Sequence, residues 1–243
     1  MAIYVIGDLH LSFGEEKPMS VFGANWEGHS EKIKEDWLGK VKPEDTVILA
    51  GDFSWAMYLE DTVKDFEYLN DLPGKKIMLK GNHDYWWTTV TRMKRFLLEH
   101  HIEHVDFLYN TSFLVENKII VGTRGWSLLD SENSKKMINR EANRLELSIQ
   151  EAIEKYGEEK EKIAIMHYPP ITKATKKEDI IYHREFIDKM KQYGIKRCYY
   201  GHLHGKSHQD AIEGEVEGIY FKLISADYLN FHLEKVPSGN EGG

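Results

Sequence analysis

Five short polar clusters in this chain each directly follow an apolar run, and this pattern constrains the fold more than any other feature. The clusters contain seven candidate metal ligands: Asp8, His10, Asp52, Asn82, His167, His202 and His204. The preceding runs are predicted to be buried strands, at Ile3–Ile6, Thr46–Ala50, Lys76–Leu79, Ile163–Met166 and Cys198–Tyr200. Side chains that leave the same end of successive parallel strands converge on the edge where open α/β sheets bind their substrates. The sequence therefore predicts one site at this edge.

The order of the predicted elements indicates an α/β fold. In the first half, strands alternate with two predicted helices, one starting at Ser30 with Ile33, Trp37 and Leu38 on one face, the other carrying Val63, Phe66 and Leu69. Such alternation implies right-handed crossovers and a parallel sheet. Later strands are predicted at Phe107–Tyr109, Ser112–Glu116, Ile119–Gly122, Gly218–Ser225 and Tyr228–Leu233, and a long helix at Ser131–Tyr156. We expect a four-layer α/β/β/α sandwich of two mixed sheets flanked by helices, as a single domain over residues 1–236 with a flexible tail over 237–243.

Composition excludes several classes of function. The chain has 243 residues, enough for one large core, and a formal net charge of −8 without a long basic block. This charge disfavours a nucleic-acid surface, which needs clustered lysine and arginine. The longest apolar runs fall far short of the roughly 20 residues of a membrane span. Because Cys198 is the single cysteine and the first strand leaves no room for a signal peptide, we expect a cytoplasmic location.

The residue types of the seven candidate ligands indicate their chemistry. Oxygen and nitrogen donors without a thiolate suit Mn, Fe, Zn, Ni or Co, and the sequence leaves the choice among them open. A structural zinc ion takes four protein ligands and a catalytic one usually three, so seven fit two divalent metal ions that share a bridging carboxylate. Two ions about 3.5–4 Å apart make hydroxide available near neutral pH and suit in-line displacement at phosphorus. The set therefore predicts attack of a metal-bridging hydroxide on a phosphate ester.

A leaving alkoxide also needs a proton. His83 lies directly beside the candidate ligand Asn82, and we expect its imidazole to donate that proton. The neighbouring carboxylate of Asp84 is expected to keep the imidazole charged and oriented.

The series Asp8-x-His10, Gly51-Asp52, Gly81-Asn82-His83-Asp84, His167 and Gly201-His202-x-His204 resembles the calcineurin-like metallophosphoesterases, in that family's order. The resemblance implies that Asp8, His10, Asp52 and His204 hold one metal. It implies that Asp52, as the bridge, together with Asn82, His167 and His202, holds the other. His83 then matches the family's catalytic acid and Asp84 its partner.

One departure from the resemblance affects the choice of substrate. Protein Ser/Thr phosphatases of this superfamily carry an arginine shortly after the bridging aspartate, whereas this chain reads Asp52-Phe53-Ser54-Trp55. Arg124 is the candidate replacement for binding the phosphoryl group, and a salt bridge to a carboxylate is the alternative role. A small phosphorylated compound, as a phosphomonoester or a phosphodiester, is thus the expected substrate. A Ser/Thr phosphoprotein phosphatase, hydrolysis of a nucleotide or lipid-linked diphosphate, and a non-catalytic metal-binding scaffold for a protein partner are alternatives, and the oligomeric state stays open.

Other residues near the clusters have less specific predictions. The glycines before the ligands, among them Gly81 and Gly201, are expected to allow close approach of the backbone. The histidines His100, His101 and His104 are expected to be structural at a helix end, and Asp227 and His232 to lie at the surface. The aromatic residues divide between core packing and a wall around the leaving group: Trp26, Trp55, Tyr85, Trp86, Trp87 and Trp126.

Overall fold

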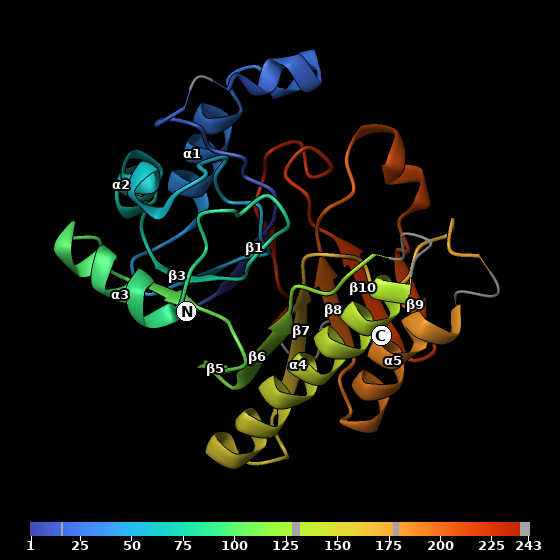
Figure 1. Cartoon of the computed structure of the whole chain (residues 1–243). Helices are drawn as coiled ribbons and strands as arrows, with labels where there is room; N and C mark the ends of the chain where they lie inside the picture. Colours follow the sequence, from blue (N-terminus) through green and yellow to red (C-terminus); the bar gives the residue numbers. More distant parts are fainter. Residues whose placement is uncertain (16, 128–131, 177–179, 239–243) are drawn as a thin grey trace.

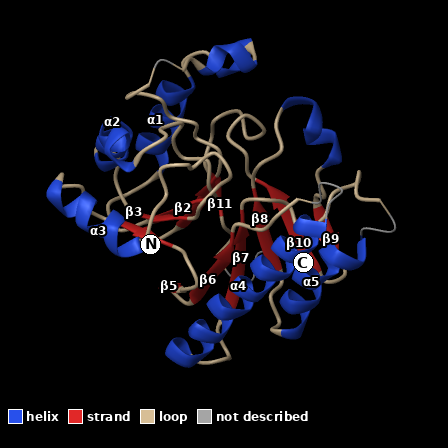
Figure 2. Ribbon diagram, viewed as in Figure 1, coloured by secondary structure: helices blue, strands red, loops and turns tan. Residues whose placement is uncertain are grey.

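The computed structural model describes residues 1–15, 17–127, 132–176 and 180–238 and contains two β-sheets (Figures 1 and 2). The first sheet has the strand order β11-β1-β2-β3-β4. Its strands are β1 (Ile3–Ile6), β2 (Thr46–Leu49), β3 (Lys75–Met78), β4 (Val105–Phe107) and β11 (Glu234–Lys235). Strands β1 to β4 are parallel to one another, and only the edge strand β11 runs antiparallel.

The second sheet has the strand order β5-β6-β7-β8-β10-β9. Its strands are β5 (Phe113–Val115), β6 (Lys118–Thr123), β7 (Glu161–Met166), β8 (Arg197–Tyr200), β9 (Gly214–Val216) and β10 (Ile219–Leu223). The four central strands are parallel, and the edge strands β5 and β9 are antiparallel to their neighbours. Both sheets are therefore mixed.

Helices cover the outer faces of the two sheets. They are α1 (His29–Lys40), α2 (Val63–Asn70), α3 (Val90–Glu99), α4 (Glu132–Tyr156) and α5 (Ile180–Gln192), with short 3₁₀ helices η1 (Met19–Phe22), η2 (Ala24–Trp26), η3 (Leu59–Thr62) and η4 (Gly205–Asp210). Side chains of α1 to α3 pack on the first sheet, and those of α4 and α5 pack on the second (Figure 1). A third buried cluster, including Ile48, Ile77, Ile120 and Ile165, fills the space between the sheets. The predicted four-layer α/β/β/α sandwich is thus confirmed.

The register of the strands brings the polar clusters to one edge. Ile6 pairs with Leu49, and Leu49 pairs with Met78, so β1, β2 and β3 end together. Met166 pairs with Tyr200 in the same way in the second sheet. The two sheets are joined at this edge, because the Gly7 N–H donates to the Ile224 carbonyl at 2.7 Å and the Gly7 carbonyl accepts from the Ala226 N–H at 3.0 Å.

Some predicted elements differ from the structure. Helix α1 follows Gly28 rather than starting at Ser30, and Leu38 is 54% exposed because it lies one residue beyond the buried Trp37. Residues Tyr228–Leu233, predicted as a strand, form a turn in which Asn230 and Phe231 have positive φ. Phe231 and Leu233 pack into the core from that turn. Their apolar side chains therefore suggested a strand where the chain forms a turn. The predicted helix start at Ser131 and residues 239–243 of the predicted tail lie outside the described residues. No helix in the described part of the chain combines the length and apolar character needed to span a bilayer.

Candidate metal centre

The backbone of four candidate ligands is in the left-handed region. The φ angles are 59° at Asp8, 48° at His10, 50° at Asp52 and 75° at His202. Residues other than glycine rarely adopt these angles, and such backbone strain concentrates at functional sites. The sharp turn at each strand end directs the ligand side chains inward.

Glycines allow these loops to approach each other closely. A Cβ atom on Gly81 would lie 2.1 Å from Oδ1 of Asp52, and one on Gly201 would lie 2.4 Å from Oδ2 of Asp8. Both distances are far below van der Waals contact, so any larger residue would displace a carboxylate. The expected close approach at these glycines is confirmed.

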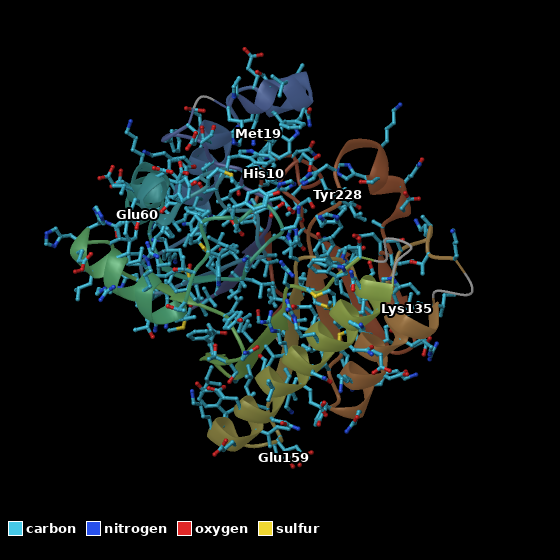
Figure 3. All side chains as sticks on the ribbon, viewed as in Figure 1. His10, Met19, Glu60, Lys135, Glu159 and Tyr228 are labelled. Carbon is cyan, nitrogen blue, oxygen red and sulfur yellow. The ribbon has the colours of Figure 1, made fainter. Side chains whose placement is uncertain are left out.

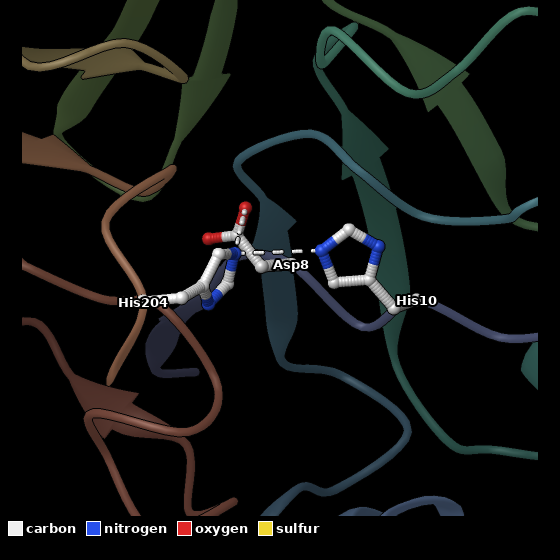
Figure 4. Close-up of side chains that lie close together, drawn as sticks. All are labelled: Asp8, His10 and His204. Carbon is white, nitrogen blue, oxygen red and sulfur yellow. Dashed lines mark hydrogen bonds and ion pairs between the residues drawn. The ribbon is translucent and has the colours of Figure 1, made fainter. Parts of the chain in front are cut away.

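The first group of candidate ligands comprises Asp8, His10 and His204 (Figure 4). Nε2 of His10 lies 3.4 Å from Nε2 of His204, and Nε2 of His204 lies 3.6 Å from Oδ1 of Asp8. Three donor atoms from the loops after β1 and β8 thus face one point, as ligands of one ion would.

The second group surrounds the side-chain oxygen of Asn82. Oδ1 of Asn82 lies 2.6 Å from Nε2 of His167 and 2.9 Å from Nδ1 of His202. One carboxylate oxygen faces both groups, since Oδ2 of Asp52 lies 3.6 Å from Nε2 of His167 and 3.7 Å from Nε2 of His10. Asp52 therefore lies where a bridging ligand would be needed.

The electrostatics of the centre favour bound cations. Asp8 and Asp52 are at most 1% exposed, and their ion pairs within the described residues involve only histidines. Burial and the charge of Asp8 raise the pKa of Asp52 to about 8. Burial also opposes the charge of Asp8, but the hydrogen bond and charge of His204 lower the pKa of Asp8. Buried carboxylates are stabilised by divalent ions, and the oxygen and nitrogen donors of all seven residues fit two such ions.

A carboxylate that we expected at the surface orients one of the histidines. Asp227 is 7% exposed, and its Oδ1 lies 2.8 Å from Nδ1 of His204. Its Oδ2 accepts from the Gly205 N–H at 3.2 Å and lies 3.2 Å from Nε2 of His208. Burial works against the charge of His204, but the hydrogen bonds to Asp227 and Asp8 raise the pKa of His204 to about 10. The surface prediction for Asp227 was wrong, and its position just after the predicted strand Gly218–Ser225 was the signal that could have identified it.

The candidate acid His83 lies beside the two groups. Its backbone N–H donates to Oδ1 of Asp52 at 2.8 Å, and its ring centroid lies 4.5 Å from that of Trp55 and 5.7 Å from that of His10. Nδ1 of His83 is buried and has no hydrogen-bond partner among the described residues. Burial lowers the pKa of His83.

Asp84 does not orient the His83 imidazole as we expected. Its fully buried carboxylate accepts from the backbone N–H groups of Asp52, Phe53, Ser54 and Gly81 and from Nε1 of Trp86, at 2.7–3.4 Å. The short side chain reaches the loop after β2 instead of the neighbouring ring. Asp84 thus holds the Asp52 loop against the Asn82 loop.

Among the described residues, Arg124 contacts Trp126 and Glu141 rather than any of the candidate ligands. Its guanidinium packs over the ring of Trp126 at 4.5 Å, and Nη2 lies 3.9 Å from Oε1 of Glu141. Nε of Arg124 is buried without a hydrogen-bond partner among the described residues. The alternative salt bridge is therefore present, and the guanidinium keeps unused donor capacity.

An apolar pocket of about 240 Å³ adjoins the first group of ligands. Its lining includes Met19, Phe22, Trp26 and Trp55 together with His10, His83 and His204. Met19, the first residue of η1, lies close to His10 in Figure 3, and both line this pocket. All four of Trp26, Trp55, Trp86 and Trp87 are buried in the core that packs on the first sheet, and Trp26 and Trp55 also form a wall at the site.

The histidines at the end of α3 and near the C-terminus lie away from the centre. His100 follows the last turn of α3, the imidazole of His104 is 73% exposed, and that of His232 is 64% exposed beside Asp36. The exposed position expected for His232 is confirmed.

Comparison with known proteins agrees with this arrangement. A family model described as calcineurin-like phosphoesterase matches residues 1–206. No curated protein matches the sequence.

Solved structures of similar fold include the protein of unknown function AQ665 from Aquifex aeolicus, at 18% identity and a TM-score of 0.52, covering 96% of this chain and 95% of that one. The protein TT1561 of Thermus thermophilus matches at 12% identity and a TM-score of 0.55, over 96% and 97% of the two chains. GAP50, described as the anchor in the inner membrane complex of Plasmodium, matches at 13% identity and a TM-score of 0.50, over 93% and 71%. At such low identities the likeness shows the fold alone.

Proposed function

Because the chain belongs to the calcineurin-like phosphoesterase family, we propose that it is a dinuclear-metal phosphohydrolase that cleaves an ester or anhydride of a small phosphorylated compound. The observation that carries this proposal is the position of Oδ2 of Asp52, within 3.7 Å of one imidazole nitrogen from each ligand group. A single carboxylate so placed can connect two ions, as hydrolysis by paired metals requires.

The proposed reaction assigns a role to each part of the centre. Two bound divalent ions, Mn, Fe, Zn, Ni or Co, would supply Lewis acidity and make hydroxide available near neutral pH. Asp8, His10 and His204 would hold one ion, Asn82, His167 and His202 would hold the other, and Asp52 would contact both. As a bond forms from the hydroxide oxygen to phosphorus, the bond from phosphorus to the leaving oxygen breaks. His83 donates the proton that this oxygen takes up.

The apolar pocket indicates where the leaving group lies. His83 lines the pocket, and the proton donor must be within hydrogen-bond reach of the leaving oxygen. An apolar or aromatic leaving group would therefore contact Trp26, Trp55 and Phe22. A pocket of this size is too small for an extended protein surface, which favours a small-molecule substrate over a phosphoprotein.

Two other functions remain as alternatives to the proposal. A Ser/Thr phosphoprotein phosphatase would use the same metal ligands, but this chain has no arginine shortly after Asp52 to support that function. A non-catalytic scaffold would keep the fold, and GAP50 is an anchor of similar fold, but loss of ligands is the expected mark of such a role. All seven ligands and His83 are present in this chain. The cytoplasmic location stays a prediction.

A screen of purified protein tests the proposal. We expect hydrolysis of bis(p-nitrophenyl) phosphate or p-nitrophenyl phosphate that a chelator abolishes and added Mn, Fe, Zn, Ni or Co restores. Faster turnover of a phosphoserine peptide than of either small ester would favour the phosphatase alternative. A fully metal-loaded protein without any turnover would favour the scaffold.

A further inference from the structure

A second cavity, of about 230 Å³, lies between the ends of β3 and β6 and helix α4. Its charged lining residues are Lys80, Arg124, Arg140, Glu141 and Arg144. We call it the basic cavity. None of its lining residues also lines the apolar pocket.

The basic cavity carries more positive charge than its carboxylate can neutralise. Glu141 is buried and is approached by Arg144 at 2.8 Å, Arg140 at 3.4 Å and Arg124 at 3.9 Å. Lys80 forms no ion pair with any described residue. Among the described residues, three arginines therefore approach one carboxylate and Lys80 lines the same cavity, in a chain whose formal net charge is −8.

Such an excess is unfavourable in a partly buried place unless an anion binds there, because like charges repel more strongly where water is scarce. Glu141 accepts short hydrogen bonds from Arg144 at 2.8 Å and from the Thr123 hydroxyl at 2.7 Å, and Arg144 also donates to the Tyr109 hydroxyl at 2.8 Å. Arg124 keeps a buried Nε without a partner in the described structure. Planar guanidinium groups with free donors suit phosphate and carboxylate groups.

The basic cavity adjoins the second ligand group, on the side away from the apolar pocket. Lys80 precedes the ligand Asn82 by two residues. The carbonyl of Arg124 accepts from the Tyr168 N–H at 2.8 Å, and the ring of Tyr168, the residue after the ligand His167, lies 4.2 Å from the ring of His202. His83 and the apolar pocket lie instead beside His10 and His204.

We propose that the basic cavity binds an anionic group, a phosphate or a carboxylate, on the part of the substrate that stays attached to phosphorus after the leaving group departs. This inference rests on the proposed function for the position of the leaving group. A retained part and a leaving group require two substituents on the reacting phosphorus. The substrate is then a phosphodiester or a phosphoanhydride with a second anionic group, rather than a simple phosphomonoester.

The first test measures binding without any turnover. Titration of inorganic phosphate into chelator-treated protein by calorimetry should show one site per chain, because the metal centre without ions presents the carboxyl groups of Asp8 and Asp52 and lacks the cations that would attract phosphate. Arg144→Gln and Arg140→Gln should each weaken this binding about tenfold or more. The Arg140 side chain is 51% exposed, so its replacement leaves folding intact.

A matched control removes an arginine from another place. Arg197→Gln on β8, which removes an ion pair with Glu161 of β7, should leave phosphate binding unchanged. Absence of phosphate binding to the folded wild-type protein, or equal binding by all three variants, would overturn the assignment. This outcome is independent of whether the protein hydrolyses any ester.

The second test identifies the anion and its connection to the metal centre. Inhibition of metal-loaded protein is compared for alkylphosphonates, α,ω-diphosphonates and ω-carboxyalkylphosphonates of increasing chain length. At one chain length a compound with two anionic groups should inhibit at least about tenfold better than the alkylphosphonate with one, and Arg144→Gln should remove this advantage only. The better of the two doubly anionic series identifies phosphate or carboxylate. If the second anionic group improved inhibition at no chain length, the basic cavity would not bind the substrate. This result would stand even if the protein hydrolyses an ester.

Discussion

Oδ1 of Asp227 lies 2.8 Å from Nδ1 of His204, and Nε2 of the same ring faces Asp8 and His10. Carboxylates that accept from the far nitrogen of a metal-binding histidine fix its ring orientation and increase its basicity. Asp227 thus acts on the centre through His204 rather than by direct contact.

Asp227→Asn should therefore weaken metal binding about 10- to 100-fold without unfolding the chain. Competition with a chromogenic chelator measures the affinity, and circular dichroism checks the fold. Asp188→Asn, which changes a carboxylate with 60% exposure, is the control. Unchanged affinity in the Asp227 variant would show that the ring is held without this contact.

The sequence pointed to the candidate metal ligands but not to Asp227, which orients one of them, and the difference has a physical reason. Ligands that directly follow parallel strands must meet, since the register of Ile6, Leu49 and Met78 brings the strand ends together. Asp227 follows β10 by four residues, in a turn held by the hydrogen bond from the Phe231 N–H to the Ala226 carbonyl and by packing of Phe231 and Leu233 on the core. Local sequence patterns do not report such a turn.

The partners of Asp84 were unpredictable for a similar reason. Adjacency in the sequence suggested His83, whereas the carboxylate accepts from N–H groups about thirty residues earlier in the chain. These contacts depend on how the loops after β2 and β3 pack against each other.

Asp84→Ala should accordingly lower stability more than catalysis. Loss of the carboxylate leaves several buried N–H groups unpaired, and we expect the free energy of unfolding to fall by about 3 kcal/mol or more. Urea denaturation measures this change, and Asp71→Ala, at an exposed position, is the control. Normal stability with lost turnover would instead support Asp84 as the partner of His83.

His83→Ala tests the acid role through the leaving group. We expect turnover to fall about 10²- to 10⁴-fold on an alkyl phosphate ester. The fall should be much smaller on a p-nitrophenyl ester, because p-nitrophenolate leaves without taking up a proton. Both metals should stay bound, and His100→Ala should behave like wild type. Equal losses on the two esters would exclude the acid role, and a missing metal would make His83 a ligand.

Lys76 predicts a pH dependence of stability. Its side chain is 1% exposed and donates to the Leu72 carbonyl, and burial lowers the pKa of Lys76 from 10.5 to about 8. Because the pKa of Lys76 is lower in the folded state, burying the charged amine destabilises the fold. The stability of the fold is therefore highest above the unfolded pKa of 10.5, where Lys76 is neutral, and that contribution is lost as pH falls through about 8.

Lys76→Met should therefore be more stable than wild type at pH ~6, by up to roughly 3 kcal/mol, and lose this advantage by pH ~10.5. Denaturant titration across this range measures the difference, with Lys64→Met, at an exposed position of α2, as control. A constant difference between the Lys76 variant and wild type at all pH values would contradict the depressed pKa.

Metal content and turnover of Asp52→Asn test the dinuclear centre most directly, because Oδ2 of Asp52 lies near the Nε2 atoms of both His10 and His167, one from each ligand group. Wild-type protein should hold about two divalent ions per chain. Asp52→Asn should lose more metal and more activity than His10→Ala or Asn82→Ala, each of which removes a ligand on one side. An Asp52→Asn variant that kept both ions and near-normal turnover would contradict the bridging assignment.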